Sequence, residues 1–197
     1  KMSLTSVYLR NFAKGLTVSQ RASIANAPQL GNPGTLRIFL NELLQYGVYE
    51  NLDGFMAGYI DTPDMKSFLN VVLTRVDGDF DPKTISNYMN LLRLSFYGVQ
   101  EEDVIDFLQL KPVEWAAVQN ALEEFTETTN GKLKLKSGDF TDVVAEHYPL
   151  SAAEEKRIRN SILGYSRKRF NVLKKESEKA VIAKEGYFTI MCSVLFI

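Results

Sequence analysis

The feature that most constrains this chain is a Gly-Asn-Pro turn at residues 31–33 that opens directly into an amphipathic segment. Proline is favourable at the first position of a helix, because its missing N–H needs no partner there and its φ angle is already helical. Apolar residues then recur with the spacing of a single helix face. They are Leu36, Phe39, Leu40, Leu43 and Leu44. The pattern predicts a helix from Pro33 to about Gly47 with one buried face.

The length and composition limit the classes of protein to which this chain can belong. The chain has 197 residues, of which 45% are hydrophobic, and a formal net charge of −1. A chain of this length can bury roughly 70% of its unfolded surface, so one or two small domains are expected. The single Cys192 excludes an internal disulfide, and with the single His147 it excludes a His/Cys zinc site. Without an 18-residue apolar run or a signal peptide, we expect a cytoplasmic protein with no membrane partner.

The first 80 residues are predicted to be helical throughout. A capping box, Thr17-x-x-Gln20, starts a helix that ends near residue 27. Thr62 as the N-cap and Pro63 at the first helical position predict another helix, preceded by a short one over residues 52–60. The turn Asp-Gly-Asp-Phe-Asp-Pro that ends at residue 82 is a plausible boundary between subdomains.

The pattern of predicted elements changes after this turn. Helices are expected over residues 82–97, 101–108 and 111–125, the last with Trp115 as its core anchor. An Asn-Gly turn and a strand of alternating leucine and lysine over residues 132–136 then predict a β-hairpin. Three helices followed by a hairpin are typical of a winged-helix domain.

The C-terminal part is predicted to be a helical extension with an apolar tail. A short helix over residues 139–147 precedes a long charged helix over 151–168, which a Ser151-x-x-Glu154 box caps. Residues 171–184 are polar and helical in character. Residues 187–197 are apolar and rich in β-formers, which favours a strand that pairs with another part of a larger protein.

Several segments together carry a family resemblance. The Gly-Asn-Pro turn resembles the (A/G)-N-P-(L/G) turn of STAND-class ATPases with a NACHT-type domain. Residues 92–104 resemble the family segment lxlSrxGLsExEL, and residues 112–115 resemble its tryptophan-bearing helix. Residues 131–148 resemble its wing and the following helix, GxlxFsHdxLRxAVxxxY. The match is colinear over about residues 6–166 and is shared with telomerase-associated, nephrocystin-like and bacterial members.

The resemblance implies a mainly α fold in three parts: a helical lid subdomain over 1–80, a winged-helix domain over 81–150, and a helical extension with the apolar tail over 151–197. The P-loop signature G-x-x-x-x-G-K-[ST] is absent from the sequence. The region is therefore expected to lack catalytic and metal-binding residues and to bind no cofactor by itself. ATP or ADP would be bound in the parent protein, where a P-loop core of the same polypeptide is the implied partner.

The resemblance also implies two nucleotide-related positions. In family members the proline of the turn packs on adenine, which here is Pro33 beside Asn32; the alternative interpretation is a simple helix-start turn. Alignment on Tyr148 places Ser137 at the family histidine that senses the β-phosphate, and Thr141 at its arginine. Serine can offer only a neutral hydrogen bond. We therefore hypothesise that nucleotide sensing by the winged helix is weakened or lost.

Other chemically interesting residues have ordinary structural interpretations. His147 is expected to be a surface histidine at a helix end. The lysines of the hairpin, Lys132, Lys134 and Lys136, either contact phosphate or form a solvated strand face. The helix over residues 111–125 carries three glutamates and one lysine, which argues against a nucleic-acid partner.

The expected function is regulatory: the region would couple the nucleotide state of a separate P-loop core to opening of the molecule and exposure of an effector or repeat domain. Two alternatives stay open. One is a winged-helix DNA-binding regulator. The other is a helical protein-interaction scaffold that binds a partner, or a second copy of itself, through Tyr187–Ile197.

Overall fold

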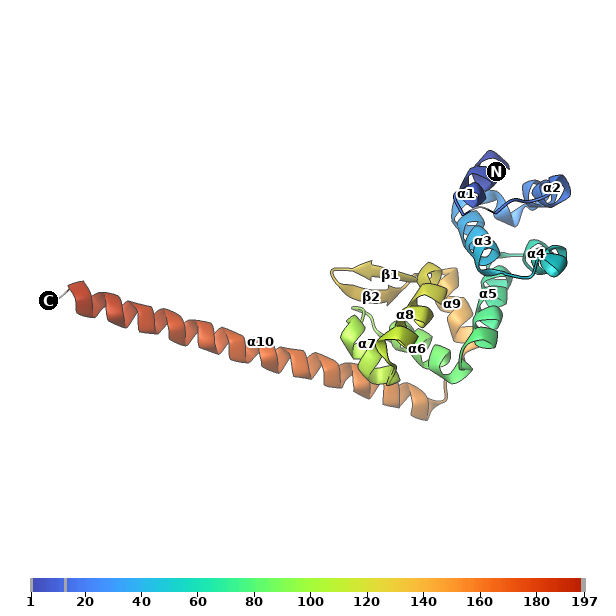
Figure 1. Cartoon of the computed structure of the whole chain (residues 1–197). Coiled ribbons are helices and arrows are strands. Elements are labelled where there is room, and N and C mark those ends of the chain that lie inside the picture. Colours follow the sequence, from blue (N-terminus) through green and yellow to red (C-terminus); the bar gives the residue numbers. More distant parts are fainter. Residues whose placement is uncertain (1, 13, 196–197) are drawn as a thin grey trace. The chain divides into compact units, whose positions relative to one another are not determined.

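The structure, a computed structural model, describes residues 2–12 and 14–195, with side chains at all of these except 2–3, 49, 173 and 178–195 (Figure 1). The chain divides into two compact units, Lys1–Pro149 and Leu150–Ile197. The described residues are mainly helical, with one two-stranded antiparallel sheet. The predicted fold class, mainly α with a β-hairpin, is confirmed.

The first part of unit 1 consists of helices alone (Figure 1). They are α1 (Met2–Arg10), α2 (Val18–Asn26), η1 (Gln29–Gly31), α3 (Pro33–Gln45), η2 (Tyr49–Asn51), α4 (Leu52–Ile60) and α5 (Met65–Asp79). The predicted capping box starts α2: the Gln20 N–H donates to Thr17 Oγ1 over 3.2 Å, and the Thr17 N–H donates to Gln20 Oε1 over 2.9 Å. The start of α3 at Pro33 is confirmed.

The predicted start of α5 was wrong by two residues. Asp64 is the N-cap, since its carboxylate accepts the Ser67 N–H over 2.8 Å. The Thr62 hydroxyl is unavailable for that role, because it donates to the Tyr59 carbonyl at the end of α4 over 2.7 Å. Pro63 therefore precedes the cap instead of occupying the first helical position.

The second part of unit 1 has the predicted order of three helices and a hairpin. Its elements are α6 (Pro82–Leu94), α7 (Glu101–Leu108), α8 (Pro112–Ala121), η3 (Glu123–Phe125), β1 (Thr126–Thr129), β2 (Lys132–Leu135) and α9 (Asp139–His147). Asn130 and Gly131 both have positive φ, 52° and 73°, as a tight hairpin turn requires. Trp115 is the predicted core anchor: it is 2% exposed and meets Tyr88 edge-on, with ring centroids 5.1 Å apart.

Helix α6 ends at Leu94, three residues earlier than predicted. Gly98 adopts φ +76° in the following turn, and a Cβ there would lie 2.8 Å from the Leu133 carbonyl oxygen. This close approach lets Val99 exchange backbone hydrogen bonds of 2.9 and 2.8 Å with Leu133 of β2. The chain leaves the helix early because the turn is held against the wing.

Unit 2 contains one long helix, α10 (Ala152–Leu195). Ser151 and Glu154 form the predicted cap, with the Ser151 N–H donating to Glu154 Oε2 over 3.0 Å. The helix continues past residue 168, where it was predicted to end, and the strand predicted over 187–197 was wrong as far as Leu195, because the backbone is helical throughout. Glycine at 164 and 186 is tolerated within a helix at a modest cost. Within the described residues, no helix combines the length and hydropathy needed to span a membrane.

Candidate functional site

The predicted adenine-side residues lie at the start of α3. The Asn32 side chain accepts the Gly34 N–H over 2.8 Å, and Pro33 occupies the first helical position. Both residues are exposed. Further along the helix, Leu36 and Phe39 are at most 3% exposed. The buried face therefore fixes the helix and leaves the proline ring at its exposed end.

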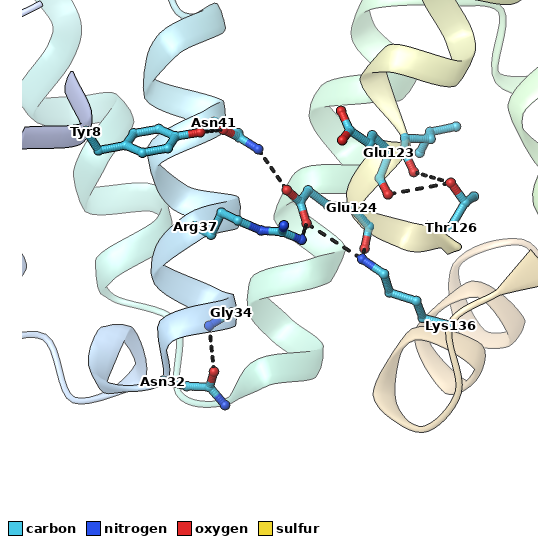
Figure 2. A network of polar contacts seen from close by, with 10 residues as sticks. Tyr8, Asn32, Gly34, Arg37, Asn41, Glu123, Glu124, Thr126 and Lys136 are labelled. Carbon is cyan, nitrogen blue, oxygen red and sulfur yellow. Dashed lines mark hydrogen bonds and ion pairs between the residues drawn. The ribbon is translucent and has the colours of Figure 1, made fainter. Parts of the chain in front are cut away.

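One helical turn after Pro33, α3 presents a polar edge to the winged-helix part (Figure 2). Arg37 Nη2 lies 2.6 Å from Glu124 Oε2, and Asn41 Nδ2 donates to Glu124 Oε1 over 2.7 Å. The Tyr8 hydroxyl donates to Asn41 Oδ1 over 2.5 Å and so fixes the orientation of the amide. These contacts connect three segments that are far apart in the sequence.

Glu124 of η3 is the centre of this arrangement. Its side chain is 12% exposed. Lys136 donates to the Glu124 carbonyl oxygen over 2.6 Å, and its ammonium lies 3.7 Å from the carboxylate (Figure 2). We call Arg37, Asn41, Glu124 and Lys136 the Glu124 junction. It joins α3 to η3 and to the residue that follows β2, and both oxygens of the Glu124 carboxylate accept a hydrogen bond.

A groove of about 710 Å³ lies beside this junction. It is lined by Arg37, Ala116, Gln119, Asn120, Glu123, Thr126, Glu127, Thr128, Leu133 and Lys136. Its two cations are already paired with Glu124, and Glu123 and Glu127 add negative charge. The groove is therefore polar without a clear preference for an anion. Pro33 and Asn32 lie outside its lining.

The predicted sensor position, Ser137, is exposed in the turn between β2 and α9. Its neighbour Lys136 is held in the Glu124 junction, and the Thr141 hydroxyl donates to the Lys136 carbonyl over 3.1 Å. Within the described residues, no hydrogen bond joins Ser137 to Asn32 or Pro33. The structure thus links Lys136, and not Ser137, to α3, through the contacts that both make with Glu124.

His147 differs from the surface residue that was predicted. It is the last residue of α9, but its side chain is only 16% exposed. Its Nδ1 lies 2.5 Å from Asn70 Oδ1 and its Nε2 lies 2.8 Å from Asp77 Oδ2. The Tyr148 hydroxyl donates to the other Asp77 oxygen over 2.7 Å. Burial and the hydrogen bond to Asp77 raise the pKa of Tyr148 well above its ordinary value. These contacts fasten α9 to α5.

The hairpin lysines do not form the uniformly solvated face that was predicted. Lys136 is engaged with Glu124 and lies 5.5 Å from the centroid of the Phe140 ring. Helix α8 carries no lysine or arginine between its first and last residues. Within the described residues, no group of three or more His, Cys, Asp or Glu side chains has the arrangement of a metal site.

Sequence reasoning missed the central residues of the junction, Arg37, Asn41 and Glu124. Each lies off the apolar stripe of its helix, and an exposed arginine or glutamate gives no periodic signal. The partners are 83 to 87 residues apart. The signal that could identify such residues is a charge pair conserved in an alignment, and a single sequence does not contain it.

The chain was compared with known proteins. No family model and no solved structure matches it. A TPR repeat-containing protein of Dictyostelium discoideum is 25% identical over 155 residues, which cover 75% of this chain. The matched region spans 9% of the length of that relative. The chain is therefore similar to a small part of a much longer repeat protein.

Proposed function

We propose that this chain is the regulatory lid and winged-helix region of a STAND-class NTPase of the NACHT type. In this proposal it couples the nucleotide state of a separate P-loop core to a conformational change of the whole polypeptide. The observation that carries the proposal is the exposed Pro33 ring at the first position of α3. The arrangement of three helices and a hairpin in the same unit supports it.

The size of the relative also supports the proposal. A region that acts on a neighbouring core should be a minor part of a longer polypeptide, and the match spans 9% of a TPR repeat-containing protein. Repeat arrays present extended binding surfaces. Exposure of such an array is a suitable output for a nucleotide-controlled switch, so protein–protein interaction is part of the proposed function.

Each part of the region has a distinct role in this proposal. The core holds the phosphates of ATP or ADP, and Pro33 packs on the adenine beside Asn32. The Glu124 junction carries the position of α3 to the wing, because Arg37 lies one turn after Pro33 on the same helix. Ser137 contributes no charge to sensing. The region by itself supplies no catalytic group, so hydrolysis belongs to the core.

The test is nucleotide binding by the full-length parent polypeptide carrying Pro33→Ala. Loss of roughly 50 Å² of apolar contact at about 25 cal/mol per Å² costs about 1 kcal/mol, or five- to tenfold in affinity. The matched control is Pro82→Ala, since Pro82 is also an exposed N1 proline that follows a side-chain cap, Asp81. Equal affinities of the two variants, or the lack of a P-loop in the parent, would contradict the proposal.

The degenerate sensor has its own test. Ser137→His in the full-length parent restores a group that can carry a positive charge at the family histidine position. The expected result is tighter nucleotide binding, with a larger gain at pH 6 than at pH 8. Unchanged affinity at both values of pH would remove the support for Ser137 as a former sensor.

The protein-interaction scaffold remains as the second candidate, favoured by the name of the relative and by the exposed pair Phe96 and Tyr97, 85% and 74% exposed. It predicts that removal of residues 187–197 abolishes association while the fold persists. The side chains of this segment lie outside the described residues. The proposal of a nucleotide-controlled switch predicts instead that removal of residues 187–197 leaves nucleotide binding unchanged.

A further inference from the structure

Two adjoining hollows lie among the N-terminal helices, apart from the Glu124 junction. The smaller has a volume of about 210 Å³ and the larger about 370 Å³. Both are lined by Leu9, Lys14, Gly15 and Leu16, so they share a wall. The larger is within the range of roughly 300–1,000 Å³ typical of small-molecule sites.

The smaller hollow is basic. Its lining includes the cations of Arg10, Lys14 and Arg21 and the hydroxyls of Thr5 and Ser6. No aspartate or glutamate is among its lining residues. Three positive charges around one small cavity repel one another unless an anion lies between them. The charge of this lining therefore favours an oxyanion.

Lys14 contributes its positive charge to the basic hollow, but it has no free hydrogen-bond donor to offer. Its ammonium donates to the carbonyl oxygens of Leu43, Leu44 and Tyr46 at the end of α3, over 3.1, 2.6 and 3.1 Å. All three of its N–H donors are used in this way. The ammonium is thus held in one position at the edge of the hollow. Direct hydrogen bonds to a bound anion are left to Arg10 and Arg21.

Two buried polar atoms of the lining have no hydrogen-bond partner among the residues that the structure describes. Thr5 is 1% exposed, and its Oγ1 makes no hydrogen bond; Arg21 Nε is also buried without one. Leaving a buried donor unsatisfied is unfavourable, and such groups in native proteins are rare. Both atoms belong to residues that line the smaller hollow. Both atoms are closed to solvent in this structure, so an oxyanion in the hollow would gain a hydrogen bond from each of them after a small rotation of the side chain.

The larger hollow is apolar. Its further lining consists of Leu43, Tyr46, Gly47, Val48 and Leu52. The Tyr46 ring is stacked on Phe55, with centroids 4.0 Å apart and an interplanar angle of 15°. This stacking fixes the ring as a wall of the hollow. An apolar or aromatic group that extends from an anion in the basic hollow would be enclosed here.

We propose that the two hollows bind a small organic oxyanion, with its phosphate or carboxylate group in the basic hollow and its apolar group in the larger one. Arginine forks recognise both phosphate and carboxylate through paired, charge-assisted hydrogen bonds. The site lies within residues 5–52 and is independent of the proposed contact between Pro33 and adenine.

The experiment is isothermal titration of the 197-residue chain with phenyl phosphate, phenylacetate and inorganic phosphate. We expect at least one aromatic anion to bind about tenfold or more tightly than inorganic phosphate, because only the aromatic probes fill the apolar hollow. The comparison of phenyl phosphate with phenylacetate distinguishes the two sources of the oxyanion.

Arg21→Met is the decisive variant, since it keeps the aliphatic length and removes the fork and the unpartnered N–H. We expect it to weaken binding about tenfold or more. Lys83→Gln is the matched control for net charge, because Lys83 is exposed on α6 and lines neither hollow. It should bind the probe like the unchanged chain.

Thr5→Val gives a second test that remains informative if Arg21→Met fails to fold. Removing an unpartnered hydroxyl should leave the melting temperature unchanged or raise it, while binding of the probe weakens. The proposal is overturned if no probe binds, or if Arg21→Met and Lys83→Gln bind equally. It is also overturned if an acidic peptide with an apolar residue binds through Arg21 while the small anions do not.

Discussion

Two glutamates of unit 1 each bind an arginine and a neutral donor, yet their surroundings differ. Glu42 is 4% exposed and accepts Arg75 Nη2 and Nε over 2.6 and 2.8 Å and the Tyr59 hydroxyl over 2.7 Å. Glu124 is 12% exposed, and its partner Arg37 is 59% exposed. The first cluster, which we call the Glu42 junction (Glu42, Tyr59 and Arg75), joins α3, α4 and α5. The Glu124 junction connects α3 to η3 and to Lys136 after β2.

The pKa values of the groups that contact Glu42 reflect its burial. Burial, with the nearby charge and hydrogen bond of Glu42, raises the pKa of Tyr59 far above its ordinary value. Burial opposes the charge of Arg75, but the hydrogen bonds and charge of Glu42 outweigh it and raise the pKa of the guanidinium. Charges held in this way cannot separate without a large cost. The solvated Arg37 can separate from its partner at a lower cost, so the Glu124 junction opens more readily than the Glu42 junction.

The largest effect is expected from Glu42→Gln. The substitution leaves the partly buried Arg75 with only the exposed Asp79, 3.0 Å away, as a counter-charge. Breaking a buried pair costs about 3–5 kcal/mol, and the remaining ion pair places the expected loss near the lower end of that range. Urea denaturation followed by circular dichroism measures the loss in the free energy of unfolding. Glu50→Gln, at an exposed position of η2, is the control and should change little. A loss no larger than that of Glu124→Gln would contradict the difference between the two junctions.

Glu124→Gln should have an intermediate effect of about 1–2 kcal/mol. Hydrogen bonds to charged groups contribute more than neutral ones, but solvent screens the exposed Arg37. Hydrogen exchange gives the sharper measurement: amides near the start of α3 and in η3 should exchange faster together, while those of α5 should not. Glu123→Gln is the matched control, because Glu123 is the exposed neighbour. Uniform acceleration through all of unit 1 would contradict a junction that opens locally.

The contact between α5 and α9 offers a smaller perturbation. Tyr148→Phe removes one hydrogen bond to Asp77 and should cost about 1 kcal/mol, because the ring stays buried and Asp77 keeps His147. Thermal unfolding measures the change. Tyr97→Phe, at a residue that is 74% exposed, is the control and should leave the melting temperature unchanged. A loss of stability as large as that of Glu42→Gln would contradict the small contribution expected from this hydrogen bond.

Local signals in the sequence predicted the elements but not the junctions. The start of α3 and the Asn-Gly hairpin depend on neighbouring residues, and both were predicted. The early end of α6 depends on Gly98 packing against Leu133 of the wing, a contact between residues distant in the sequence. The same holds for Glu42 with Arg75 and for Arg37 with Glu124. A single sequence carries periodicity and capping chemistry, while pairings across 33 or 87 residues leave no trace in it.

The smallest effect is expected at Asp81, a carboxylate that is exposed at the protein surface. Asp81 caps α6, accepting the Thr84 hydroxyl over 2.7 Å and the Thr84 N–H over 2.8 Å. These hydrogen bonds, that of the hydroxyl first, hold the pKa of Asp81 below its ordinary value of 3.8. The folded state thus binds this proton more weakly than the unfolded state. The stabilisation is complete above the ordinary pKa and disappears as the pH falls through the lowered one.

Asp81→Ala should therefore lower the melting temperature slightly at pH 6, and the deficit should shrink below about pH 4, where the carboxylate of the unchanged chain is itself protonated. Asp81→Asn keeps a capping oxygen but cannot titrate. Its difference from Asp81→Ala should stay nearly constant with pH. Melting curves from pH 3 to 6 compare the three proteins. A deficit that grows toward low pH would reverse the sign of the linkage and exclude the ionised side chain as the stabilising cap.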